Sequence, residues 1–146
     1  MQSRKIFLRA LNDKNMLRDL FQINSLIILL MDSVEKINFI RQKACEHLPE
    51  ANEKILWSVH AIRKLRLERL RKVKVEESLK QCEMVEDYAM EGRPLPGCLV
   101  ICFIGGMPFH SVVALDYDLD RIFIITVYKP SSERWESDWK TRKRQS

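Results

Sequence analysis

Three apolar runs follow one another in the second half of the chain. They cover residues 98–104, 109–116 and 121–128, and the turn sequences GGMP and DLD separate them. Runs of seven or eight residues rich in β-branched and aromatic side chains, bounded by Gly, Pro and Asp, are typical of strands joined by tight turns. Because such short connections cannot join parallel strands, the pattern predicts a three-stranded antiparallel meander.

Before the meander, apolar residues recur at three- and four-residue intervals, which is helical spacing. This spacing predicts a helix from Asp32 or Ser33 to about His47, a second helix over residues 52–70 and a short third helix over residues 74–80. His47 would lie at a helix C-terminus, in a structural or solvated position.

An acidic strand is expected at residues 82–88, on the edge of the sheet. After Pro130, Ser131 or Ser132 is expected to cap a last helical turn that carries Trp135 and Trp139. The predicted fold class is therefore α+β, with N-terminal helices packed on a four-stranded antiparallel sheet whose strands follow chain order.

The first thirty residues differ from the rest of the chain. The apolar stretch at residues 23–30 is far shorter than the roughly 20 residues of a membrane span, and no small-residue cleavage site follows it. We interpret residues 1–30 as an N-terminal extension and residues 31–146 as a single α+β domain. The competing interpretation is an extra helix over residues 15–31 that packs on the body.

The chain has 146 residues and a net charge of +5, and its cations are concentrated in one segment. Residues 54–74 contain eight cations and one anion. A patch of one sign favours a polyanionic partner such as RNA, DNA or an acidic protein, and the alternative is a solvated helix face. The candidate nucleic-acid-binding residues are Arg63, Lys64, Arg66, Arg69, Arg71 and Lys72.

Four scattered cysteines indicate neither a disulfide framework nor a metal site. Cys98 and Cys102 lie four apart in a predicted strand, so they share a face about 13 Å apart, too far for a bond or a shared metal. We expect reduced core thiols in a cytoplasmic protein. No phosphate-binding or dinucleotide-binding motif is present, and no cofactor is expected.

Two histidines are the strongest candidates for chemistry. His60 lies on the predicted basic helix, and His110 lies on a strand face. If those faces meet, two imidazoles, several cations and a tyrosine, Tyr88 or Tyr128, would line one groove suited to metal-independent RNA cleavage. The alternatives are that His110 is a hydrogen-bonded core residue and that His60 holds the helix to the sheet. Trp135 and Trp139 also fit packing roles.

Several segments resemble a widespread prokaryotic domain-of-unknown-function family, DUF4258. They are SVHA at residues 58–61, GRPLP at 92–96, PFHSVV at 108–113 and ITVYKP at 125–130, followed by ERWE at 133–136 and Arg142. The resemblance covers about residues 54–144. The chain departs from the pattern at Ala89, where relatives often have proline, and at Ser111, where valine is commoner.

The resemblance implies a RelE-like toxin fold, in which helices pack on a curved antiparallel sheet. Many relatives of this type are ribonucleases encoded beside a zinc-finger or helix-turn-helix antitoxin. The positions that match the pattern are His60, His110, Thr126, Tyr128, Arg134, Trp135 and Arg142.

The leading hypothesis is a toxin-like endoribonuclease that acts without metal on RNA, free or on the ribosome. His60 and His110 would share the acid–base work, with Tyr128 in the groove and with Lys64, Arg66 and Arg134 stabilising phosphate. The second hypothesis is a non-catalytic module whose basic helix binds nucleic acid or an acidic antitoxin, with no membrane partner. A third is a structural accessory protein.

Overall fold

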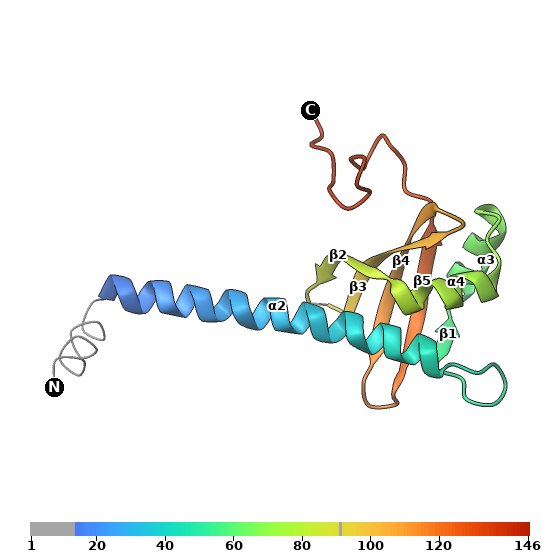
Figure 1. Cartoon of the computed structure of the whole chain (residues 1–146), viewed down its shortest axis with the longest axis horizontal. Coiled ribbons are helices and arrows are strands. Elements are labelled where there is room, and N and C mark those ends of the chain that lie inside the picture. Colours follow the sequence, from blue (N-terminus) through green and yellow to red (C-terminus); the bar gives the residue numbers. More distant parts are fainter. Residues whose placement is uncertain (1–13, 91) are drawn as a thin grey trace. The chain divides into compact units, whose positions relative to one another are not determined.

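The computed structural model describes residues 14–90 and 92–146, with residues 28–31 described by their helical backbone alone. It divides at residue 35 into two compact units. Figure 1 shows the elements, which are α2 (Lys14–Glu46), β1 (Ile55–Trp57), α3 (Val59–Leu67), α4 (Lys72–Ser78), the 3-10 helix η1 (Leu79–Gln81), β2 (Glu83–Tyr88), β3 (Gly97–Ile104), β4 (Met107–Asp116) and β5 (Arg121–Tyr128). No helix among these residues combines the length and the apolar character needed to span a membrane.

Helix α2 begins at Lys14 and is continuous through Asp32 and Ser33. The prediction that a helix starts at one of these two residues is therefore wrong, because each lies within an unbroken helical ladder. The predicted end near His47 is confirmed to within one residue. The part of the proposed extension before residue 14 lies outside the described residues.

The sheet has five strands in the order β1-β5-β4-β3-β2. The four strands β2 to β5 are antiparallel neighbours in chain order, as the hairpin pattern predicts. The fifth strand, β1, pairs in parallel with β5 and was not predicted. A mixed α+β fold is thus confirmed, and the prediction of a purely antiparallel four-stranded sheet is wrong.

Strand β1 occupies part of the segment predicted as a helix over residues 52–70. Its three apolar residues fit a helical stripe as well as a buried strand, and so spacing alone cannot distinguish the two. The parallel pairing shows that this segment is a strand, because Ile55 aligns with Ile122 and Trp57 with Ile124. The helix begins only after Ser58, whose hydroxyl accepts a hydrogen bond from the Ala61 amide at 2.9 Å.

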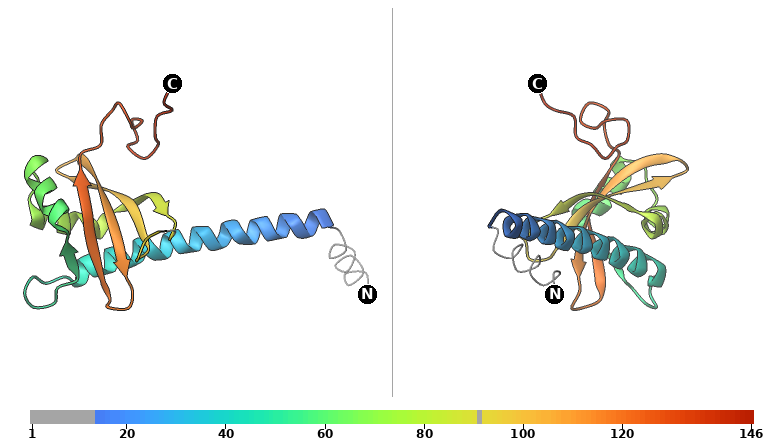
Figure 2. Two further views of the ribbon diagram at one scale, coloured as in Figure 1. Left: turned by 180° about the vertical axis from the view of Figure 1, so that it is seen from behind. Right: turned by 60° about the vertical axis from the view of Figure 1, so that its left-hand side comes forward.

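The core lies between one face of the sheet and the helices, and residues 36–46 of α2 cross that face (Figures 1 and 2). Alternate residues of the strands, including Val100, Val113 and Ile124, are fully buried against Ile40 and Leu79. The described structure contains four free cysteines and no disulfide: Cys45 is exposed, whereas Cys82, Cys98 and Cys102 are buried. The prediction of core thiols holds for Cys98 and Cys102.

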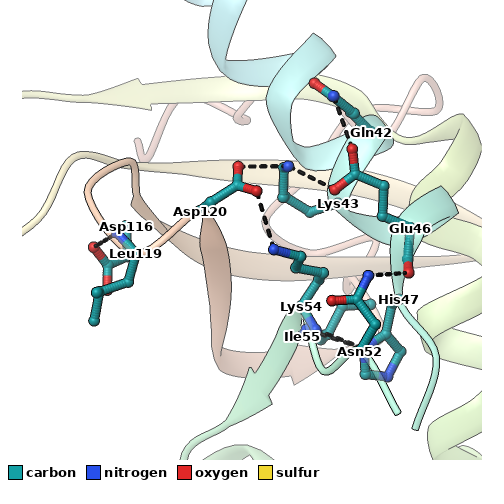
Figure 3. Close-up of polar contacts among 10 residues, drawn as sticks. All are labelled: Gln42, Lys43, Glu46, His47, Asn52, Lys54, Ile55, Asp116, Leu119 and Asp120. Carbon is teal, nitrogen blue, oxygen red and sulfur yellow. Dashed lines mark hydrogen bonds and ion pairs between the residues drawn. The ribbon is translucent and has the colours of Figure 1, made fainter.

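Polar contacts join the end of α2 to β1 and to the β4–β5 turn (Figure 3). The buried ammonium of Lys43 forms ion pairs with Glu46 and Asp120, and Asp120 also pairs with Lys54 at 3.0 Å. His47 Nδ1 accepts hydrogen bonds from the backbone amides of Lys54, at 2.9 Å, and of Ile55, at 3.2 Å. These contacts hold the chain in the position from which β1 enters the sheet.

The chain after β5 makes one turn over residues 131–135, in which the Trp135 amide donates to the Ser131 carbonyl at 3.0 Å and the Glu133 amide donates to the Ser131 hydroxyl at 3.2 Å. The prediction of a turn capped by Ser131 that carries Trp135 is therefore confirmed, but Trp139 lies outside this turn, because the chain then folds back in a hairpin-like loop.

Trp135 and Arg142 form an isolated antiparallel bridge, and the Lys143 amide donates to the Arg134 carbonyl at 2.8 Å. Trp139 has a φ of 59°, a left-handed conformation that ends any helical turn at this residue. The segment therefore folds back, and each tryptophan is placed by a different contact.

Candidate functional site

A β-bulge in β5 determines where helix α3 begins. Val112 aligns with Thr126 and the next residue, Val113, aligns with Ile124, so Ile125 is the extra residue of β5. The Ile124 and Ile125 carbonyls accept hydrogen bonds from the backbone amide and the hydroxyl of Ser58, at 3.0 and 2.8 Å. The residue that caps α3 is therefore attached to the bulge. Bulges of this kind re-aim the side chains beside them.

His60 lies in the first turn of α3, two residues after the cap. Its Nε2 atom is 3.1 Å from the hydroxyl oxygen of Thr126, on the C-terminal side of the bulge. The imidazole is exposed to solvent. The bulge, the cap and this contact together place a solvent-accessible histidine beside the end of β5.

His110 lies on β4 and is fully buried. Its Nε2 atom is 2.7 Å from the Trp139 carbonyl oxygen, which can only accept, so Nε2 carries the proton. In the neutral ring Nδ1 is then an acceptor, and the Tyr128 hydroxyl, 3.2 Å away, donates to it. Burial lowers the pKa of His110, although the carbonyl contact works in the opposite direction. The His110 ring is therefore neutral and accepts the hydrogen bond of the Tyr128 hydroxyl.

The C-terminal segment covers this histidine. The indole of Trp135 meets the imidazole edge to face, with ring centroids 4.5 Å apart. The guanidinium of Arg142 lies 4.7 Å from the Trp135 ring centroid and forms an ion pair with Glu86 on β2. The hydrogen bond from Arg142 lowers the pKa of Glu86. The loop is thus attached to the edge of the sheet by a charged contact and an aromatic contact.

A pocket of about 620 Å³ opens between α3, the end of β5 and the C-terminal segment. Three of the four predicted catalytic residues line it: His60, Tyr128 and Arg134. The fourth, His110, does not reach the pocket, because the C-terminal segment closes over its ring. The predicted direct proton transfer by His110 therefore conflicts with its burial, and His110 contacts the pocket-lining residue Tyr128 through the tyrosine hydroxyl.

The predicted basic surface contributes little to the pocket. Of its six residues only Lys64 lines the pocket; the others are exposed outside it: Arg63, Arg66, Arg69, Arg71 and Lys72. Lys64 pairs with Glu68 at 3.4 Å, and Glu68 also accepts a hydrogen bond from the Lys129 amide. Glu68 therefore links α3 to the residue that follows β5.

The sequence analysis named Arg134 and Arg142 as candidates but did not predict that they share a surface with Lys143 and Arg144. Arg134 and Arg142 line both the first pocket and a second polar pocket of about 790 Å³, which Lys143 and Arg144 also line. The two pockets form a continuous cation-bearing surface. The clue in the sequence was the run of four cations over residues 140–144, which reads as a frayed tail when taken alone.

Among residues 14–90 and 92–146, no group of three or more His, Cys, Asp or Glu side chains is arranged to hold a metal ion. The polar side chains that line the pocket include an imidazole, a phenol, two aliphatic hydroxyls, ammonium and guanidinium groups, and two carboxylates. Such a set can bind an anion and exchange protons with it.

Residues 57–129 match the family described as domain of unknown function DUF4258. The chain belongs to this family. The DUF4258 segment begins at Trp57, the last residue of β1, and includes the cap of α3, His60, His110 and Tyr128. The residues Arg134, Trp135 and Arg142 lie beyond its end. No curated protein and no solved structure matches the chain.

Proposed function

We propose that this DUF4258 protein is a metal-independent endoribonuclease whose active site is the pocket between α3 and the end of β5. The observation that carries the proposal is the exposed imidazole of His60 in a cation-lined pocket that Tyr128 also lines. An imidazole titrates near pH 6.5 and exchanges protons readily at neutral pH.

In this proposal, RNA supplies its own nucleophile. His60 accepts the proton of a ribose 2′-hydroxyl, the oxygen attacks the adjacent phosphorus, and the bond to the 5′-oxygen breaks. Lys64 and Arg134 stabilise the negative charge that develops on the phosphoryl oxygens. The products are a 2′,3′-cyclic phosphate and a free 5′-hydroxyl.

Tyr128 is the proposed acid that protonates the leaving 5′-oxygen. Burial raises the pKa of Tyr128, so the phenol remains protonated at neutral pH. In the free protein its hydroxyl is held by His110, and on binding RNA it would turn to the leaving oxygen. His110 is then a positioning residue, and this assignment replaces the predicted sharing of acid–base work between His60 and His110.

The finer identity proposed is that of a RelE-like toxin, paired with an antitoxin and acting on RNA in the cytoplasm. The antiparallel strands β2 to β5 with helices on one face support the resemblance. Strand β1, parallel to β5, is a departure from the expected sheet. Growth arrest on induction, rescued by a neighbouring gene, would support the toxin identity.

The direct test is cleavage of a labelled RNA by the purified full-length chain in EDTA. We expect cleavage to a cyclic phosphate and a loss of roughly 10²- to 10⁴-fold in the His60→Gln variant, the range typical of a general acid or base. Lys80→Ala is the matched cation control, since Lys80 lies outside both pockets and pairs with Glu77. Unchanged cleavage by a His60→Ala, His110→Ala double variant would rule out the mechanism.

A non-catalytic nucleic-acid-binding module is the second candidate. The observation that favours it is that Lys64 and Arg142 already pair with Glu68 and Glu86, and His110 is closed to solvent. Such a module binds RNA without cutting it, and its affinity falls steeply with salt because phosphate contacts release counterions. Binding to an acidic protein but not to RNA would instead support an antitoxin-binding role.

A further inference from the structure

The part of α2 in the first unit carries an apolar stripe. Its described members are 43% to 58% exposed: Met16, Leu20, Ile23, Ile27 and Val34. Successive members lie four, three, four and seven residues apart, and the sequence places a leucine at residue 30, within the last interval. Alternating steps of four and three residues are heptad spacing, which makes an apolar seam that faces another helix.

We infer that this stripe is the contact surface for a second copy of the chain, paired antiparallel through α2. When two copies cross with residue 25 at the centre, Met16 of one helix faces Val34 of the other, and Ile23 faces Ile27. Both layers are apolar, and each recurs on the opposite side of the two-fold axis. A self-complementary surface of this kind is what a closed symmetric dimer requires.

The charges at the ends of the stripe select the antiparallel arrangement. Lys14, Arg18 and Asp19 lie at one end, with a net charge of +1, and Asp32 and Glu35 lie at the other, with a net charge of −2. An antiparallel pair places the cationic end of each helix beside the acidic end of its partner. A parallel pair would place like charges together, which is unfavourable.

The size of the stripe determines how strong the dimer is. Large apolar side chains offer on the order of 60–120 Å² each, so a half-exposed stripe buries a few hundred Å² per copy. Stable interfaces bury about 800 Å² per partner. The pair is therefore reversible and concentration-dependent. Its seam ends at Val34, within the first unit.

Sedimentation equilibrium of the full-length chain over a range of concentrations tests the pairing. We expect the mass to rise from one 17.3-kDa chain towards two as concentration increases. An Ile23→Ala, Ile27→Ala variant should weaken association at least tenfold while keeping good helix propensity. Phe21→Ala is the control, since Phe21 is 78% exposed but lies on the opposite face of the helix, and it should change association less than twofold.

A monomer at every concentration, or an equal effect of the Phe21 control, would overturn the proposal. So would a monomer that binds vesicles of phosphatidylcholine and phosphatidylglycerol through the stripe, because the occupant would then be lipid.

Disulfide trapping tests the direction of the pair in a Cys45→Ser background, which removes the exposed native thiol. Chains carrying Met16→Cys and chains carrying Val34→Cys should form a mixed disulfide when combined under mild oxidation, and neither should cross-link to itself. Self-cross-linking of the Met16→Cys chain would show a parallel pair and contradict the antiparallel arrangement.

Discussion

The Nδ1 atom of His110 lies 3.2 Å from the hydroxyl oxygen of Tyr128, directly across the β4–β5 pairing. Because the Trp139 carbonyl occupies the other ring nitrogen, His110 can only accept from Tyr128 while the ring is neutral. The backbone carbonyl of Trp139 thus determines that the Tyr128 hydroxyl donates its hydrogen bond to His110.

This arrangement predicts how stability depends on pH. Burial holds the pKa of His110 below its ordinary value of about 6.5, so below that pH the unfolded chain binds more protons than the folded one. Stability contributed by the neutral ring is complete above pH 6.5 and is lost as the pH falls towards the folded-state pKa. Urea unfolding at pH 7.5 and at pH 5.5 should show the loss.

The matched variant is His110→Phe, which is less stable but does not titrate at this position. Its free energy of unfolding should change less than that of the native chain between the two pH values, since His47 and His60 are common to both proteins. Identical pH dependence in the two proteins would contradict the assignment.

Replacing Tyr128 with phenylalanine should affect both stability and activity. The change leaves the buried Nδ1 of His110 without a donor, which costs about 1–3 kcal/mol of unfolding free energy. If Tyr128 is the acid of the proposed cleavage, the rate falls roughly 10²-fold or more. Urea unfolding and RNA cleavage at a fixed pH measure the two effects.

Tyr88→Phe serves as the control for Tyr128→Phe. Tyr88 is a half-buried tyrosine of β2 that does not line the pocket. The Tyr88→Phe substitution should leave the rate of RNA cleavage unchanged. A similar loss of rate in both variants would indicate a general effect on the sheet.

Ser58→Ala should destabilise the protein by about 1 kcal/mol, the usual value of an N-cap. The substitution removes the acceptor for the Ala61 amide and the donor to the Ile125 carbonyl. Ser131→Ala, which removes an acceptor for the Glu133 amide in an exposed turn, should cost less than half as much. Thermal unfolding of the two variants side by side gives the comparison.

Thiol labelling should distinguish Cys45 from the other three cysteines. Cys45 is exposed, whereas Cys82, Cys98 and Cys102 are buried, and burial raises the pKa of Cys98 to about 12. A thiol-reactive dye should therefore label one cysteine per native chain and four in denaturant. Rapid labelling of a second cysteine in the native protein would show that a buried site opens.

Local pattern predicted β2 to β5 well, because short turns between apolar runs leave antiparallel pairing as the only geometry. It failed at β1, whose three residues are too few to show alternation and whose partner strand lies about 67 residues later in the chain. It also failed at Trp139, since helical spacing cannot reveal that the chain folds back after Trp135.

The candidate site, like the fold, was predicted from the sequence only in part. The identities of His60, Tyr128 and Arg134 pointed to one pocket, and the structure brings them together. The burial of His110 was one of two interpretations that strand alternation allowed. The C-terminal segment that covers His110 shows that the buried interpretation is correct. Its Trp139 carbonyl, 29 residues later in the chain, accepts a hydrogen bond from His110 Nε2.

By itself, the sequence determined the four antiparallel strands, the helical segment before them, the cationic balance and the residue types available for chemistry. These follow from periodicity and composition, which act over a few residues at a time. Tertiary structure alone decided the parallel strand, the bulge that places His60 and the loop that closes over His110. Each depends on contacts between segments distant in the chain, whose free energy appears only when the core forms.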